Sequence, residues 1–210
     1  MIELNKMAFS DHIVKVSGVA PFSFIYDGKS SKDILKNWKI DQRTETIDDN
    51  RTKNIVTYTD PATGLEIQCE AIVYSDYPAV EWVIYFTNTS KADTPIIQDI
   101  QAIDALITAD TLEPIILHHS QGSLCNDTDF LPYDDSISKG EKKTLTTSGG
   151  RSSQNSLPFY NIQLGSEGLI VAIGWSGQWI SSIERLDDGI NIKAGMELTY
   201  LKLHPGESIR

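Results

Sequence analysis

Short segments in which β-branched and aromatic residues alternate with polar ones occur along most of the chain. We expect strands at residues 13–16, 54–59, 65–74, 79–87, 96–103, 115–119, 159–164, 168–175, 179–185, 190–193 and 198–203. Such alternation is typical of strands with one buried face. The sequence Asp-Pro-Ala-Thr-Gly at residues 60–64 separates two of these segments and predicts a hairpin. So many strands with few helical patterns predict an all-β fold, a large antiparallel β-sandwich.

One short helix is expected near residue 30. Residues 30–33, Ser-Ser-Lys-Asp, provide an N-cap and an acid in the first turn. Ile34, Leu35 and Trp38 follow at helical spacing. The stretch 120–156 is rich in polar residues and glycine, and we interpret it as a long functional loop.

Length and charge exclude several classes of protein. The chain has 210 residues, whereas a typical (β/α)₈ barrel needs about 250. Its 29 acidic and 18 basic residues give a net charge of -11, so we expect no nucleic acid and no anionic membrane as partner. Residues 1–6 show no signal peptide, and two reduced cysteines are expected at Cys69 and Cys125. These features predict a cytoplasmic protein, with export left open.

Two turns carry residue types that bind ligands. Gly149 and Gly150 permit a positive φ, and Arg151 beside them can donate a fork of hydrogen bonds to a ligand or to carbonyls of the turn. Trp175 and Trp179 flank a second turn, where two indole rings form a sugar platform or close a hairpin within the core. Gln178 between them can bond a sugar hydroxyl as donor and acceptor.

His118 and His119 are adjacent in an expected strand, so they point to opposite faces and do not easily share one metal ion. We expect one of them to be buried and hydrogen-bonded and the other to face a cleft. Asp129 lies in an acidic loop that lacks a complete calcium-loop pattern. No metal and no other cofactor is therefore expected. The glycosylation sequons at Asn88 and Asn126 are interpreted as chance matches.

Five motifs occur in a fixed order in the C-terminal third. They are Gly-Gly-Arg-Ser-Ser at 149–153, Leu-Pro-Phe-Tyr-Asn at 157–161, Gly-Trp-Ser-Gly-Gln-Trp at 174–179, Gly-Met-Glu at 195–197 and Leu-His-Pro-Gly-Glu-Ser-Ile-Arg at 203–210. This order resembles the N-terminal β-domain of α-galactosidases of glycoside hydrolase family 36, which has an Arg-Gly-Ser-like turn, an Asn-Pro-Phe-like segment, a Tyr-Ser-Gly-Asn-Phe-like turn and a Pro-Gly-Glu close. The departures from these motifs indicate a divergent branch.

The resemblance implies a supersandwich fold like that of galactose mutarotase, as one domain over residues 1–210. In the family, the catalytic aspartates lie in a (β/α)₈ barrel that follows the Pro-Gly-Glu segment, so no catalytic residue is assigned to this chain. The expected partners are that barrel in the same chain, an α-galactoside-like carbohydrate and further copies in a homo-oligomer. Two alternatives with a sugar ligand stay open: a stand-alone carbohydrate-binding module, and a mutarotase-like epimerase in which His118 or His119 is the general acid. A third is an oligomerisation domain with no sugar contact.

The candidate residues gather in three loops. We expect residues 118–135, Gly149–Ser153 and Trp175–Trp179 to cluster at one end of the sandwich, facing the barrel or the sugar-binding rim. The candidates for carbohydrate binding or for a domain interface are His118, His119, Asp129, Arg151, Trp175, Gln178 and Trp179.

Overall fold

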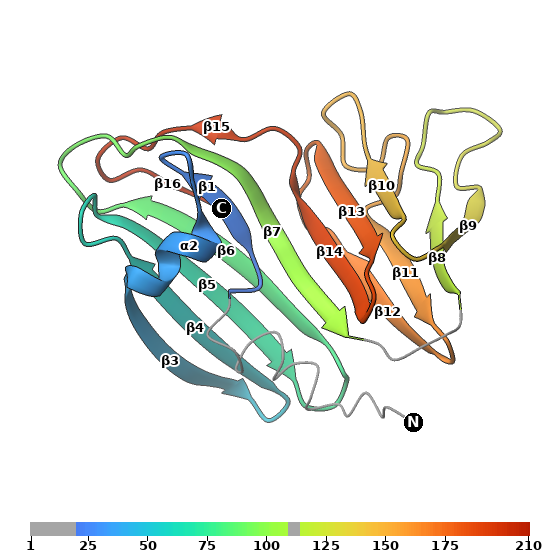
Figure 1. Ribbon diagram of the computed structural model, residues 1–210, viewed down its shortest axis with the longest axis horizontal. Coiled ribbons are helices and arrows are strands. Elements are labelled where there is room, and N and C mark those ends of the chain that lie inside the picture. The colour runs from blue at the N-terminus through green and yellow to red at the C-terminus, as the bar shows by residue number, and fades with distance from the viewer. Residues whose placement is uncertain (1–19, 109–113) are drawn as a thin grey trace. The chain divides into compact units, whose positions relative to one another are not determined.

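A computed structural model describes residues 20–108 and 114–210 and shows an all-β protein (Figure 1). The N-terminal strands are β1 (Ser23–Tyr26), β2 (Lys29–Ser30), β3 (Lys39–Asp48), β4 (Arg51–Thr59), β5 (Leu65–Tyr74), β6 (Val80–Asn88), β7 (Ile97–Thr108) and β8 (Ile115–Ser120). The later strands are β9 (Pro132–Ile137), β10 (Lys142–Thr146), β11 (Phe159–Leu164), β12 (Glu167–Ala172), β13 (Trp179–Arg185), β14 (Gly189–Met196), β15 (Tyr200–Leu201) and β16 (Ser208–Ile209). They form three antiparallel sheets, which confirms the predicted fold class.

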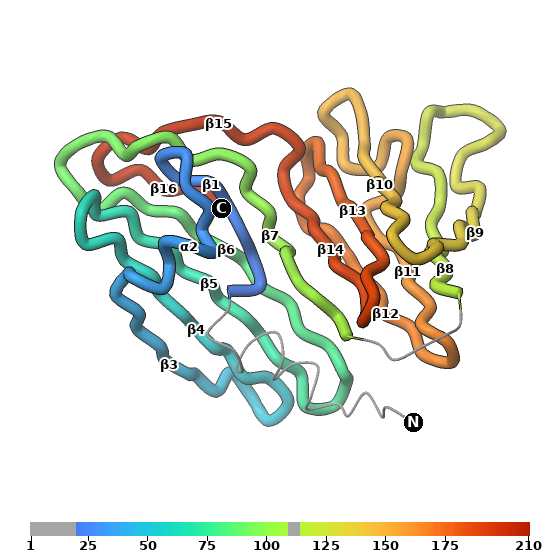
Figure 2. The backbone as a smooth tube through the Cα atoms, viewed as in Figure 1, coloured from blue at the N-terminus to red at the C-terminus, as the bar shows by residue number. Residues whose placement is uncertain are grey.

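The chain forms two compact units. Unit 1 comprises the described residues up to Ala102 together with Thr199–Arg210, and unit 2 comprises Ile103–Leu198. Strand β7 begins in unit 1 and ends in unit 2. The backbone trace in Figure 2 follows the chain out of unit 1 along β7 and back into it before β15. A single domain over residues 1–210 stays a prediction.

Unit 1 contains a five-stranded sheet in the order β16-β6-β5-β4-β3. The predicted hairpin at residues 60–64 joins β4 to β5. The core of unit 1 is aromatic. The ring centroids of Phe24 and Phe86 lie 5.3 Å apart, edge to face, and those of Trp38 and Tyr26 lie 5.9 Å apart. The predicted helix is present as α2 (Ser31–Ile34), followed by one 3₁₀ turn, η2 (Leu35–Asn37). The Ser30 side chain caps α2 by accepting from the Lys32 amide.

Unit 2 is a sandwich around one apolar core. Its four-stranded sheet has the order β12-β11-β8-β9, and β10, β13 and β14 are neighbours in the opposite sheet. The inner faces of both sheets supply the buried cluster, which includes Leu117, Ile137, Ile162, Trp179 and Ile183. These residues alternate with outward-facing ones along each strand, which is why the apolar pattern of this region identified its strands.

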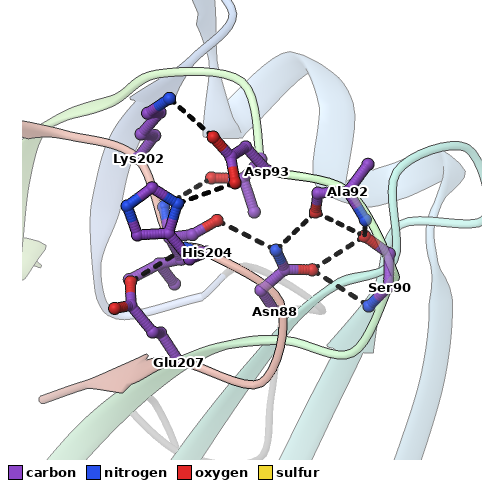
Figure 3. Close-up of polar contacts among 9 residues, drawn as sticks. Asn88, Ser90, Ala92, Asp93, Lys202, His204 and Glu207 are labelled. Atoms are coloured by element: carbon purple, nitrogen blue, oxygen red, sulfur yellow. Dashed lines mark hydrogen bonds and ion pairs between the residues drawn. The ribbon is translucent and has the colours of Figure 1, made fainter.

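The C-terminal segment of unit 1 is held against the end of β6 by Asn88 (Figure 3). The buried Asn88 amide donates to the carbonyls of Ala92 at 2.7 Å and Leu203 at 2.9 Å. Asp93 accepts from Lys202 at 2.5 Å and pairs with His204 at 2.7 Å. Because the Asn88 amide nitrogen is buried and donates both of these hydrogen bonds, the glycosylation sequon at Asn88 does not present an acceptor for a glycan in the folded chain.

Two longer segments of the described chain depart from the sequence expectations. Strand β3 was not predicted, because all ten of its residues are exposed and carry no apolar alternation. The stretch 120–156 was expected as one long loop, and that expectation was wrong, since it contains β9 and β10. Both are short, largely polar strands. The segment expected at 13–16 lies outside the described residues, and no helix among the described ones is long and apolar enough to span a membrane.

Candidate functional site

Three loops meet at one end of unit 2, where β8 and β10 finish and β11 and β13 begin (Figure 1). The Gly122 amide donates to the Asn155 carbonyl at 3.0 Å, and the Ser123 amide donates to that of Ser153 at 2.8 Å. The Trp179 indole N–H donates to the Ser152 carbonyl at 2.8 Å. The predicted clustering of the three loops is therefore confirmed, and we call this end the loop cluster.

The two tryptophans of the 175–179 turn have different environments. Trp179 is fully buried in the core of unit 2, whereas Trp175 is 40% exposed. The Trp175 ring lies against Gly177, where an added Cβ would come within 2.8 Å of the indole nitrogen. A platform made of both rings is thus not present. Trp175 is the ring that offers a surface, and Trp179 supports the turn from inside the core.

Gln178 is committed to hydrogen bonds within the loop cluster. Its amide nitrogen donates to the Glu197 carboxylate, and its oxygen accepts from the Gly150 amide at 3.4 Å. Glu197 was not among the candidates, although it belongs to the Gly-Met-Glu motif at 195–197. Only the pairing of β13 with β14 shows that Glu197 lies beside Gln178. The pair adds carboxylate and amide groups to the turn that carries the exposed Trp175.

Arg151 follows two glycines that both adopt positive φ, at 63° for Gly149 and 71° for Gly150. Its Nε and Nη2 donate to the side-chain oxygen of Gln154 at 3.0 and 2.6 Å. The guanidinium is therefore held by a side-chain amide, not by the backbone carbonyls of the turn. It remains exposed at the surface of the loop cluster.

Asp129 organises the loop between β8 and β9. Its carboxylate accepts from the Ser123 hydroxyl at 2.7 Å and from the amides of Leu124 at 2.7 Å and Cys125 at 3.0 Å. The bond from Ser123, followed by the Leu124 amide, lowers the pKa of Asp129 below its ordinary value. The loop exposes Leu124, Phe130 and Leu131 to solvent. Asp129 thus has a structural role in shaping this apolar loop.

His118 and His119 point to opposite faces of the sheet, as strand alternation predicts. His118 bonds Asp134 at 2.6 Å through Nδ1 and Gln163 at 3.0 Å through Nε2, and its side chain is 34% exposed. The bond to Asp134, and then that to Gln163, raises the pKa of His118. His119 is more buried, bonds Asp135 at 3.3 Å and stacks on the Tyr133 ring.

The described ranges contain an open hollow but no cluster of metal ligands. Within residues 20–108 and 114–210, no group of three or more His, Cys, Asp or Glu side chains is placed to hold a metal ion. An open hollow of about 460 Å³ lies in unit 1, and none of the predicted site residues lines it. It is lined by Asp48, Asp49, Asn50, Arg51, Tyr74, Asp76 and Tyr77. Sequence patterns gave no signal for it, because the hairpin that forms it includes the unpredicted strand β3.

The described residues form an all-β protein of two units, one of which carries an exposed tryptophan, a Gln–Glu pair and an arginine at one end. Solved structures of glycoside hydrolase family 36 α-galactosidases share this fold. AgaA from Geobacillus stearothermophilus matches over 91% of this chain and 29% of its own, with a TM-score of 0.66 and 14% identity. AgaB from the same organism and the α-galactosidase from Lactobacillus brevis each give a TM-score of 0.67 over 91% of this chain and 28% of theirs, with 14% and 15% identity.

The chain thus spans less than a third of the length of the structures it matches, as the predicted N-terminal domain of such an enzyme would. No protein-family model matches the sequence, and no curated protein matches it. At 14–15% identity the likeness shows the fold alone. The chain resembles one domain of these multi-domain α-galactosidases.

Proposed function

We propose that this chain is the non-catalytic N-terminal β-domain of an α-galactosidase-like glycoside hydrolase, which packs on a catalytic barrel and shapes its carbohydrate-binding rim or an oligomer interface. The observation that carries the proposal is the fold match, which covers 91% of this chain but only 29% of AgaA. We infer a supporting part for this domain, which corresponds to less than a third of such an enzyme. The hydrolytic chemistry belongs, in this proposal, to the remainder of the protein.

The loop cluster supports a role at a carbohydrate rim. The exposed Trp175 ring offers an apolar face to a pyranose, and Gln178 of the same turn and its partner Glu197 offer groups that bond hydroxyls. Their mutual bond and the Gly150 amide fix these groups before any ligand arrives, which lowers the entropic cost of binding. Arg151 adds a fixed positive charge to this acidic chain.

We also propose a cytoplasmic location. Cys69 and Cys125 are both free thiols in the structure. Unpaired cysteines are usual in reducing compartments.

The first experiment separates a supporting domain from the two alternatives. We expect the 210-residue chain alone to leave an aryl α-galactoside unhydrolysed and to show no heat of binding to millimolar galactose, melibiose or raffinose by isothermal titration. Measurable binding would favour a stand-alone carbohydrate-binding module. Anomerisation of galactose in a polarimeter, lost in His118→Ala or His119→Ala, would favour an epimerase. Either result overturns the proposal.

The second experiment concerns the longer protein. The reading frame beyond Arg210 should encode a barrel containing catalytic aspartates. In that protein, Trp175→Ala should raise KM for raffinose several-fold and leave kcat unchanged, because the ring touches parts of the substrate away from the reacting bond. Tyr200→Ala, at a 74% exposed side chain of unit 1, is the matched control. An unchanged KM in Trp175→Ala would contradict the proposed role of this domain in shaping the carbohydrate-binding rim.

A further inference from the structure

Strand β3 is an unusually open sheet edge. It forms the last strand of the five-stranded sheet in unit 1, and in Figure 1 it lies at the free border of that sheet. All ten residues from Lys39 to Asp48 are exposed, and their outward backbone groups have no strand partner within the described chain. An exposed edge of this length is a template for pairing with another strand. A long edge therefore needs a partner or a device that prevents pairing.

The charges on β3 specify one partner. Lys39, Asp41, Arg43 and Glu45 follow one another at every second position, so they share one face and alternate in sign. When the row is followed backwards, from Glu45 to Lys39, the charge at each of the four positions is opposite to the charge found there in the forward direction. An antiparallel second copy centred on Gln42 would place Glu45 opposite Lys39 and Arg43 opposite Asp41, four favourable pairs in all.

Backbone geometry agrees with this register. A two-fold axis perpendicular to the sheet keeps each side chain on its own face, so the register is centred on a residue such as Gln42, and the axis passes between the two copies of that residue. The paired segment then runs from residue 39 to residue 45. It ends before the irregularity between Thr46 and Asp48, where β3 no longer follows a regular ladder.

The other edges in the described residues lack this self-complementarity. Edge strand β9 carries Asp134 and Asp135, and edge strand β10 carries Lys142 and Lys143. Two copies of either would bring like charges together, which opposes pairing. Edge strand β12 has a single charged residue, Glu167, and β2 and β16 have two residues each.

The only ion pair within the charged row is weak. Arg43 Nε lies 3.5 Å from Glu45 Oε1, and the two side chains are 59% and 49% exposed. Exposed pairs of this kind contribute little to folding. Both side chains are thus free to reorient toward a second strand.

We propose that β3 is a homodimer interface in which two copies of this chain pair antiparallel about Gln42 and continue the five-stranded sheet from one copy into the other. The pairing gives the outward backbone groups of β3 hydrogen-bond partners, and it forms four ion pairs between the two strands. It would supply the oligomer interface named in the proposed function, but it does not rest on the hydrolase part of that proposal, because a sheet edge pairs in the same way whether or not the chain serves a hydrolase.

Two variants of uniform charge test the interface. Lys39→Glu with Arg43→Glu makes the row entirely acidic, and Asp41→Lys with Glu45→Lys makes it entirely basic. In sedimentation velocity over a micromolar concentration series, the wild-type chain should dimerise, and each variant should associate at least about tenfold more weakly. An equimolar mixture of the two variants should dimerise again, because the acidic and basic rows are complementary.

Two further measurements locate the contact. Backbone amides of β3 should gain protection from hydrogen exchange as protein concentration rises, and dimerisation should weaken between about 50 and about 500 mM salt. The matched control is Lys142→Glu with Lys143→Glu on edge strand β10, which should leave dimerisation unchanged. Circular dichroism confirms that each variant is folded.

Several results would overturn the proposal. These are a wild-type chain that stays monomeric throughout the series, a dimer that persists in both uniform variants, or a mixture that fails to associate. Sugar binding and hydrolysis are measured separately. Failure of the dimer therefore leaves standing the proposal of a non-catalytic domain that shapes a carbohydrate-binding rim, and the reverse also holds.

Discussion

At the scale of single residues, a side chain's neighbours decide its role more than its type does. Trp175 and Trp179 belong to one turn and were equal candidates, but only the first is exposed. His118 and His119 were predicted on opposite faces from strand alternation alone. Their partners Asp134, Asp135 and Gln163 come from other strands, and no local pattern sets the register that brings them together.

Trp179→Ala should lower the free energy of unfolding by about 3–5 kcal/mol. The indole is fully buried, and its loss leaves a cavity and removes the bond to the Ser152 carbonyl. Trp175→Ala, at a 40% exposed ring, is the matched control and should cost less than about 1 kcal/mol. Urea denaturation monitored by circular dichroism measures both. Equal losses would show that the two rings are equally buried in solution.

His118 should titrate above its ordinary pKa of 6.5, because Asp134 and then Gln163 hydrogen-bond to it. A raised pKa means that the folded chain binds the proton more tightly than the unfolded chain does. The resulting stability is present below pH 6.5 and is lost as the pH rises through the folded-state pKa. NMR titration of the ring should show this midpoint, and Asp134→Asn should lower it.

Asp127→Asn is the control for this titration, since Asp127 makes no bond to His118 in the structure. The stability difference between the wild type and Asp134→Asn should shrink as the pH is raised above 6.5. A difference that grows in that direction would contradict a raised pKa of His118 in the folded chain.

At the scale of elements, burial separates the strands that were predictable from those that were not. The bounds of β11 and β13 were predicted correctly, because both alternate buried and partly exposed residues. Strand β3 is exposed on both faces, and β9 and β10 carry mostly polar residues at sheet edges. Such strands are held by backbone pairing, which leaves no apolar period in the sequence.

Gly122→Ala should disrupt the junction between two loops of the loop cluster. An added Cβ would overlap the Ser153 carbonyl oxygen and lie 2.7 Å from its carbon, and both atoms are backbone. To relieve this overlap, the two segments joined by the hydrogen bonds of the Gly122 and Ser123 backbone amides must move apart, which costs about 1–3 kcal/mol of stability. Thermal denaturation measures the loss, and hydrogen exchange of the Gly122 and Ser123 amides locates it.

Gly174→Ala is the matched control, because an added Cβ there meets nothing within 4 Å. It should leave both stability and amide protection unchanged. If the two substitutions behave alike, the loops are not joined at Gly122.

At the scale of the whole molecule, the strand patterns along the chain predicted the fold class, and the ordered motifs of the C-terminal third predicted the resemblance. The three loops of unit 2 that carry the candidate residues do converge, because antiparallel strands bring alternate connections to the same end of a sandwich. The division into two units was not predicted, since strands of one kind occur in both and no linker separates them. Whether the chain unfolds as one domain is open to a direct test.

The two thiols provide that test. Cys125 is exposed, whereas Cys69 in β5 is 5% exposed. Burial, and to a lesser extent the negative charge of Glu70, raises the pKa of the Cys69 thiol to about 12. Ellman's reagent should therefore modify Cys125 alone in the native chain and both cysteines after unfolding. Rapid modification of both would place Cys69 at the surface.

Urea titration of a buried thiol in each unit then measures cooperativity. Cys125→Ser leaves Cys69 as the reporter of unit 1, and adding Cys69→Ser with Ala194→Cys places the reporter in β14 of unit 2. The two thiols should become reactive at the same urea concentration, because β7 supplies residues to both units and unfolding either one removes part of a strand from the other. Midpoints that differ beyond the effect of the substitutions on stability would show that the predicted single domain is two independently folding ones.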